Sequence, residues 1–496
     1  MMKRYIAFPI LLLLAGISLL SCTRELIPPQ AIVREQSLQN KKDLMAWYYG
    51  FYTYFRTLQY GNFSLLQDYQ ADMLNASKTN KKQHTYNWDE FTSSTGSVGT
   101  VFLSYYATIR NINFFLDKVE SYSPERASIA DTVKIARGAA HFFRAYCYHE
   151  LALRWSRPYQ PDELCVPWVG QLDLKDKPVR ATQKEIFDHI LKDLEQADRL
   201  LRARAGRPNS TEVTVDVVRA LKARVALTMS DWDMAKEACY DVASSGYSFM
   251  TSAVAIEKYW HEDRISNENL MLLLGSYPNE LTQSMIALSE RQKSKGYKLQ
   301  PAWLPAKWVV DLYEDADWRK GVYFTHEDLL DINDMVYPQK AWAVNKFPGN
   351  TLFNKSGNLE YRHLPKPFRL PEIYMIWAEA AAMSGEDDVA RDKLNTLRAA
   401  RGLAAVEAAV TGDALLEEIR KERTRELAFE GYRLFDLRRW GLSCTRHDAQ
   451  DESFLNVTSR EGGIDLDRPN SDPKFVWPIP HHDIICNPSI RQNAGW

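Results

Sequence analysis

The densest group of charged and aromatic residues lies near the C-terminus, in the stretch RTRELAFEGYRLFDLRRWG (residues 423–441). It could be an active site, a nucleic-acid patch or a piece of architecture. It contains no Ser, Cys or His to act as a nucleophile or metal ligand. Its charges are spaced like the solvated or ion-paired face of a packing helix, with a break at Gly431. We therefore interpret this signature stretch as architecture.

Catalytic signatures are missing elsewhere too. There is no P-loop, GxG dinucleotide fingerprint, HExxH or GxSxG. His481, His482 and Asp483 are adjacent in a Pro-flanked turn, where neighbouring side chains diverge, so we expect no metal and no cofactor. The sequence leaves open a carboxylate pair for glycoside hydrolysis, because any two of the 64 acidic residues could meet in the fold.

Helical periodicity dominates the chain and predicts a mostly α protein. Thr182, with Glu185 three residues later, has the pattern of a capping box. The region from about residue 247 to 371 is richer in Pro, Gly and Asn and has little periodicity. The expected helices are 102–120, 135–155, 182–201, 215–229, 371–385 and 414–430.

Two helix pairs resemble each other without a gap, in ARVALTMSDWDMAKEAC and AEAAAMSGEDDVARDKL. Small residues at helical spacing allow two helices to approach closely, which indicates tetratricopeptide-like hairpins. Long insertions separate the repeats, and we expect a ligand site in those insertions. The matched positions are Ala223 with Ala378, Ala226 with Ala381, Asp233 with Asp388, and Ala235 with Ala390.

The N-terminus MMKRYIAFPILLLLAGISLLSC predicts export, because a basic start precedes a short apolar run and a small residue. The run is shorter than the roughly 20 apolar residues of a membrane-spanning helix. The sequence LLSC is similar to a bacterial lipobox, in which Cys22 is acylated and becomes the mature N-terminus. The alternative is an ordinary cleaved signal peptide. We expect a signal peptide over residues 1–21 and a lipidated tether over residues 22–45.

The composition of the chain limits which classes of partner we expect it to bind. The formal net charge of −2 creates no global field for nucleic acid, and export argues against that partner as well. The apolar share of 45% is enough for a sizeable core. Five cysteines follow Cys22 without CxxC spacing, so we expect neither a disulfide framework nor a zinc site.

The signature stretch resembles the C-terminal signature of SusD/RagB-family lipoproteins, the surface nutrient-binding proteins of Bacteroidetes. Three further blocks agree in order: ARGAAHFFRAYCYHELALRWSRPY, FRLPEIYMIWAEAAA and VWPIPHHDIICNPSIRQNAGW. The resemblance implies a SusD-like α-α superhelix of tetratricopeptide-like helix pairs with a loop-rich ligand-binding half. The N-terminal repeat region would cover residues 46–246, and the C-terminal region, with an irregular insertion and the final helix pairs, residues 247–496.

The resemblance also implies a lipid-anchored, non-enzymatic protein on the extracellular side of the outer membrane. It would dock over a SusC-type TonB-dependent transporter that imports glycans or, in the RagB branch, peptides. In this interpretation Asp436, Arg438 and Arg439 fix the turn after the last helix and do not contact substrate. The leading hypothesis is capture of an oligosaccharide. The alternatives are a peptide-binding import component, a secreted glycoside hydrolase and an interaction scaffold without a small ligand.

In starch-binding members, the loop after the acidic residue that resembles Asp72 supplies Trp side chains that stack on sugar rings. Here it reads MLNASKTNKKQHTYNWDEF, with amides and ammoniums before the first aromatics. This departure favours an acidic or polar glycan, or a peptide. Trp303 is expected to be structural. The expected ligand contacts are Asn75, Lys78, His84, Tyr86 and Trp88 in this loop, and Tyr277, Tyr297 and Trp342 in the middle region.

Overall fold

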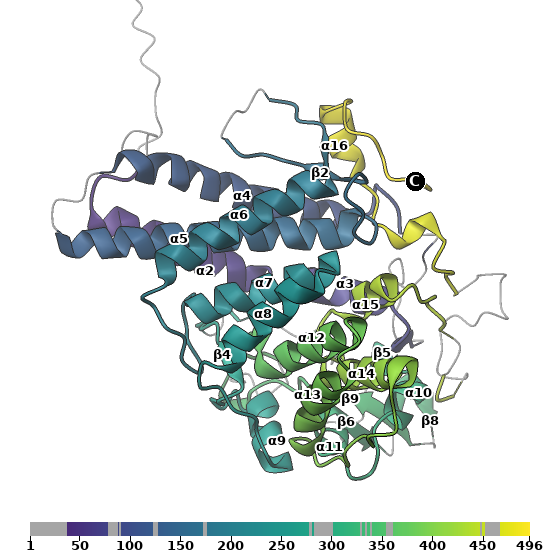
Figure 1. Cartoon of the computed structure of the whole chain (residues 1–496). Helices are drawn as coiled ribbons and strands as arrows, with labels where there is room; N and C mark the ends of the chain where they lie inside the picture. Colours follow the sequence, from purple (N-terminus) through teal and green to yellow (C-terminus); the bar gives the residue numbers. More distant parts are fainter. Residues whose placement is uncertain are drawn as a thin grey trace, which may run out of the picture.

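The computed structural model describes residues 37–77, 88, 91–122, 127–171, 176–276, 280–281, 301–327, 330–332, 335–337, 340–353, 361–446, 449–451 and 467–496. Helices dominate these residues, which confirms the predicted fold class (Figure 1). They are α2 (Lys41–Thr57), α3 (Asn62–Gln70), α4 (Gly96–Ser121), α5 (Ala127–Trp155), α6 (Gln183–Leu201), α7 (Val215–Met229), α8 (Trp232–Ala243), α9 (Ala253–His261), α10 (Lys307–Asp311), α11 (Lys320–Tyr323), α12 (Leu370–Met383), α13 (Asp387–Ala399), α14 (Gly412–Glu426), α15 (Arg433–Arg439) and α16 (His481–Cys486).

Consecutive helices pack as pairs, α4 with α5, α5 with α6, α7 with α8, and α12 with α13 (Figure 1). The two hairpins that the sequence repeat predicts are α7–α8 and α12–α13. Ala223, Ala226, Ala378 and Ala381 are fully buried, because small side chains let the paired helices approach closely. Helix α8 also packs on α12, so the two hairpins are neighbours in one stack although a long insertion separates them in the chain.

The predicted capping box of α6 is present. Thr182 Oγ1 accepts a hydrogen bond from the backbone N–H of Glu185 at 3.2 Å, and the Thr182 N–H donates to Glu185 Oε2 at 2.8 Å. Two of the backbone donors that a helix start leaves unpaired are thereby satisfied. This fixes where the chain turns from β3 (Arg180–Thr182) into α6.

The described strands are short and form five antiparallel pairs, with no larger sheet among the residues described. Most lie in the region that lacked helical periodicity. The pairs are β1 (Leu74–Ala76) with β5 (Trp303–Pro305), β2 (Leu164–Pro167) with β3 (Arg180–Thr182), β4 (Asn269–Met271) with β10 (Phe368–Arg369), β6 (Phe324–Glu327) with β9 (Ala341–Val344), and β7 (Leu330–Ile332) with β8 (Met335–Tyr337).

The largest hydrophobic cluster runs from Leu44 to Ile490 and includes residues on both sides of position 246. Helix α12 contributes to it through Leu370, Ile373 and Ile376. The N-terminal helices and the C-terminal helices therefore share one core. This shared core holds segments that are far apart in the sequence rigidly together. A site assembled from distant loops requires such rigid support.

Candidate functional site

The signature stretch is built around a buried carboxylate. Glu426, at the end of α14, is 1% exposed and accepts hydrogen bonds from three arginines. Arg401 Nε lies 2.9 Å from Glu426 Oε2, Arg319 Nη1 lies 3.0 Å from the same oxygen, and Arg369 Nη1 lies 2.9 Å from Oε1. Burial alone would raise the pKa of Glu426, but the three guanidiniums outweigh it and hold that pKa well below its ordinary value.

Other charged side chains of the stretch are paired in the same way. Asp436 accepts from Arg423 Nε at 2.8 Å and from Arg439 Nη2 at 3.0 Å, and Arg433 Nη2 donates to Asp72 Oδ2 at 2.7 Å. The stretch therefore joins α14 and α15 to α3, and the interpretation as architecture agrees with these contacts. Of the two expected environments, solvated or ion-paired, the structure shows the ion-paired one, because these pairs lie inside the protein.

Trp88 does not lie on an open surface. It is 1% exposed and belongs to a hydrophobic cluster with Phe475, whose ring centroid is 5.2 Å away. The guanidiniums of Arg446 and Arg468 lie 5.9 and 5.7 Å from the Trp88 ring. A ring enclosed in this way has no free face for a sugar. The expectation that Trp88 stacks on a ligand is corrected by its burial.

Asn75 is also buried, at 2% exposed, because it lies in β1 opposite Leu304 of β5. Its expected role as a surface ligand contact is corrected for the same reason. One residue past β1, the Ser77 N–H donates to Ala302 O at 3.0 Å, and Ser77 Oγ donates to Pro301 O at 2.5 Å. The residue after which the loop starts, Ser77, therefore lies beside the residue at which the insertion ends, Pro301.

Trp342 is the one predicted aromatic that the described residues place at a partly open surface. It is half-buried on β9, and its ring stacks on His326 of β6 at 4.5 Å with an interplanar angle of 14°. Gln450 holds the strand in place. Its Oε1 accepts from the Trp342 N–H at 2.8 Å, and its Nε2 donates to Trp342 O at 3.0 Å and to Pro305 O at 2.8 Å.

We call the region formed by Ser77, Pro301, His326, Trp342 and Gln450 the loop junction; Ser77 and Pro301 are buried within it, and His326 and Trp342 lie at its surface. Strand β5 links its two ends, because β5 pairs with β1 and contacts β9. Positions 301 and 305 are separated by four residues, or about 13 Å at the rise of an extended strand. The remaining expected contacts lie outside the described residues; they are Lys78, His84, Tyr86, Tyr277 and Tyr297.

Sequence reasoning missed His326 and Gln450. The chain carries no pattern that marks them, since 108 positions separate Gln450 from Trp342 and the contact exists only after folding. The imidazole of His326 reaches the Trp342 ring because β6 and β9 pair with His326 directly opposite Trp342. Which side chains face each other across two paired strands depends on the register of the pairing, and that register depends on both strands.

The adjacent histidines His481 and His482 begin α16, whose described side chains are not buried. The Cys486 sulfur lies 3.5 Å from His482 Nε2 at the exposed surface. Within the described part of the chain, no three His, Cys, Asp or Glu side chains lie close enough to hold a metal ion together. None of the helices in these described residues is long and apolar enough to cross a membrane.

Comparison with known proteins identifies relatives over nearly the whole chain. Residues 285–496 match the profile of the SusD family, and residues 29–227 match a second SusD-like family described as "Starch-binding associating with outer membrane". The SusD-like protein P38 of Formosa agariphila is 22% identical over 486 residues, which cover 89% of this chain and 86% of P38.

Solved structures share the fold. A SusD superfamily protein from Bacteroides thetaiotaomicron matches with a TM-score of 0.76 and 22% identity, covering 92% of this chain and 99% of that one. A putative sugar binding protein from Bacteroides vulgatus matches with a TM-score of 0.74 and 23% identity, covering 93% of this chain and 99% of that one. These likenesses establish that the helical stack and its loop-rich half are arranged as in those proteins.

Proposed function

Because the chain belongs to the SusD/RagB family of outer-membrane-associated nutrient-binding proteins, we propose that it captures an oligosaccharide at the loop junction and delivers it to a SusC-type TonB-dependent transporter. The observation that carries the proposal is Trp342. Its half-buried ring is held by His326 on one side and by Gln450 along the backbone. A flat ring fixed at a partly open surface is suited to stack on the apolar face of a sugar.

Two segments with polar side chains begin or end at the loop junction. Ser77, after which the loop begins, lies beside Pro301, where the insertion ends, and both segments contain amide, ammonium and phenol side chains in their sequence. Such groups donate hydrogen bonds to the hydroxyls and carboxylates of a polar glycan. Lys78, His84, Tyr86, Tyr277 and Tyr297 remain the proposed contacts from these segments.

We expect Trp342→Ala to weaken oligosaccharide binding about ten- to hundredfold, because a stacking anchor contributes on the order of 1–3 kcal/mol. A glycan and peptide panel on the full chain would first identify the ligand, and calorimetry would then compare the affinities. Trp377→Ala is the matched control, since Trp377 is also half-buried but lies on α12.

An unchanged affinity in folded Trp342→Ala protein would contradict the assignment of the ligand to the loop junction. Selective binding of peptides would favour the RagB-like alternative, and cleavage of a glycan during incubation would favour the glycoside hydrolase. Within the described residues, the carboxylates of the signature stretch, Glu426, Glu430 and Asp436, are each held in an ion pair with an arginine, which argues against using them as a catalytic pair.

We also propose that Cys22, which lies outside the described residues, carries the lipid that anchors the protein at the outer membrane. Cys22→Ala should move the protein from the membrane fraction to the soluble fraction in cells that lack the transporter partner, because the acyl chains then have no attachment point. Cys486→Ala is the matched control, since this exposed thiol lies on α16. Sedimentation of the Cys22→Ala protein with membranes would contradict the anchor.

A further inference from the structure

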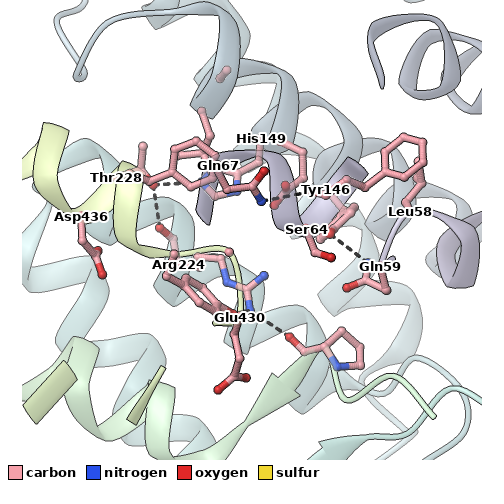
Figure 2. A pocket seen from close by; sticks show the side chains of 18 of the residues that line it. Leu58, Gln59, Ser64, Gln67, Tyr146, His149, Arg224, Thr228, Glu430 and Asp436 are labelled. Atoms are coloured by element: carbon pink, nitrogen blue, oxygen red, sulfur yellow. Dashed lines mark hydrogen bonds between the residues drawn. The ribbon is translucent and has the colours of Figure 1, made fainter. Parts of the chain in front are cut away.

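A cavity lies inside the helical stack, and none of the loop-junction residues lines it. Its volume is about 400 Å³, which falls within the range of small-molecule sites. Helices α3, α5, α7 and α15 and the segment 363–367 form its walls, and Figure 2 shows side chains from these elements around one space. Arg157, Pro158 and Ser230 are exposed at its edge, so the cavity opens between the end of α5 and the α7–α8 turn.

The lining has more basic than acidic side chains, six against three. Arg157, at the mouth, and Arg438, inside, have no carboxylate within ion-pair distance among the residues described. The other four basic side chains are paired with acids: Arg224 with Glu372, Lys366 with Asp263, Arg423 with Asp436, and Arg439 with Glu379.

Arg438 is a buried cation that the fold only partly neutralises. Its Nη1 donates to Leu153 O at 2.6 Å, and its Nη2 donates to Ser156 O, so the side chain caps the C-terminus of α5. The helix dipole offsets part of the charge. Burial lowers the pKa of Arg438 to about 10, which leaves it charged at neutral pH. Arg438 Nε and Arg423 Nη1 are buried N–H groups without a partner in the described structure.

The lining also has unused acceptors. Thr228 Oγ1 donates to Arg224 O at 3.0 Å, so it accepts from His149 Nε2, which lies 2.9 Å away (Figure 2). Burial lowers the pKa of His149 to about 4, so Nδ1 carries a lone pair at neutral pH. Neither His149 Nδ1 nor Gln67 Oε1 has a partner among the described residues. Buried polar atoms without a hydrogen-bond partner are rare in folded proteins unless water or a ligand makes the missing hydrogen bond.

We propose that this cavity binds a small hydroxylated molecule with an oxyanion, a sugar carboxylate or a sugar phosphate. The oxyanion would face the surplus guanidinium N–H groups of Arg423 and Arg438, and hydroxyl groups would donate to Gln67 and His149. Aromatic side chains supply the apolar surface that a ring needs. These side chains are Phe63, Tyr146, Phe187, Tyr432 and Phe435. The site is separate from the loop junction and does not depend on the function proposed there.

Calorimetry on the full chain tests this with three probes that share a hexose ring: glucuronate, glucose 6-phosphate and glucose. We expect at least one of the two acids to bind at least tenfold more tightly than glucose, because only the acids meet the unpaired guanidiniums. Glucuronate alone would identify a carboxylate site, and glucose 6-phosphate alone a phosphate site. Equal binding of glucose, or no binding of either acid at millimolar concentration, would overturn the proposal.

Two variants locate the binding site. Ser64→Leu fills part of the cavity from α3 without removing a charge and should weaken binding of the acid about tenfold or more. Arg157→Gln removes the cation at the mouth and should weaken it about threefold. Arg202→Gln changes an exposed arginine at the C-cap of α6 and is the matched control, and Trp342→Ala should have no effect. Affinities within twofold of wild type in both Ser64→Leu and Arg157→Gln would overturn the assignment to this cavity.

Discussion

Glu426→Gln is expected to lower the free energy of unfolding by about 3–5 kcal/mol, because it removes the charge from one partner of a buried ion network. Arg319, Arg369 and Arg401 all contact the carboxylate of Glu426 inside the protein. Each arginine keeps another acidic partner, but the network as a whole would then hold an uncompensated buried positive charge. Urea unfolding followed by circular dichroism measures the loss.

The matched control is Asp188→Asn, which removes a carboxylate from the exposed pair between Lys184 and Asp188 on α6. Exposed pairs contribute about 0.2–1 kcal/mol, so the control should stay within that range. A loss below about 1 kcal/mol in Glu426→Gln would mean that the ion network does not hold the signature stretch in place.

The pH dependence of Glu426→Gln gives an independent check. The folded protein holds the pKa values of Glu426, Glu422 and Asp436 below their ordinary values, because the opposing effect of burial is outweighed by arginines. The stability that these carboxylates contribute is therefore fully present at neutral pH, above their unfolded-state pKa of about 4. It is lost as the pH falls from that value through their folded-state pKa values. The stability difference between wild type and Glu426→Gln should shrink over this acidic range.

Trp88→Ala should destabilise the protein by about 3–5 kcal/mol, which is the usual cost of truncating a fully buried Trp. The ring fills the space between Phe475 and the side chains of α15, including Leu434 and Leu437. Removing it leaves a cavity that these neighbours cannot fill. Thermal or urea unfolding of the purified variant measures the effect.

Trp342→Ala is the matched variant for this prediction, because the same side chain is removed from a half-buried position. It should cost clearly less stability than Trp88→Ala and instead affect ligand affinity. Folded Trp88→Ala protein should bind the ligand like wild type. The opposite pattern, with a stable Trp88→Ala protein that has lost binding, would return Trp88 to the ligand site.

The sequence alone determined the fold class and its repeating unit. Helical periodicity, the capping box at Thr182 and the small residues at Ala223 and Ala378 are local features that the structure confirms. They are readable because helix geometry depends on residues three and four positions apart. The signature stretch was likewise identified as architecture, since its residue types excluded a nucleophile.

Only the tertiary structure decided what lies at the surface. Trp88 stands between Asn87 and Asp89 in the chain, whereas Trp303 and Trp342 each have two apolar neighbours, yet Trp88 and Trp303 are buried and Trp342 is partly open. Trp303 stacks on Tyr69 at 4.1 Å, as its structural interpretation predicted, whereas Trp88 was misassigned. Burial of a ring depends on partners that are distant in sequence, such as Phe475 for Trp88. The loop junction depends on strand pairing, and the cavity on helices brought together from both ends of the chain; neither leaves a local pattern to read.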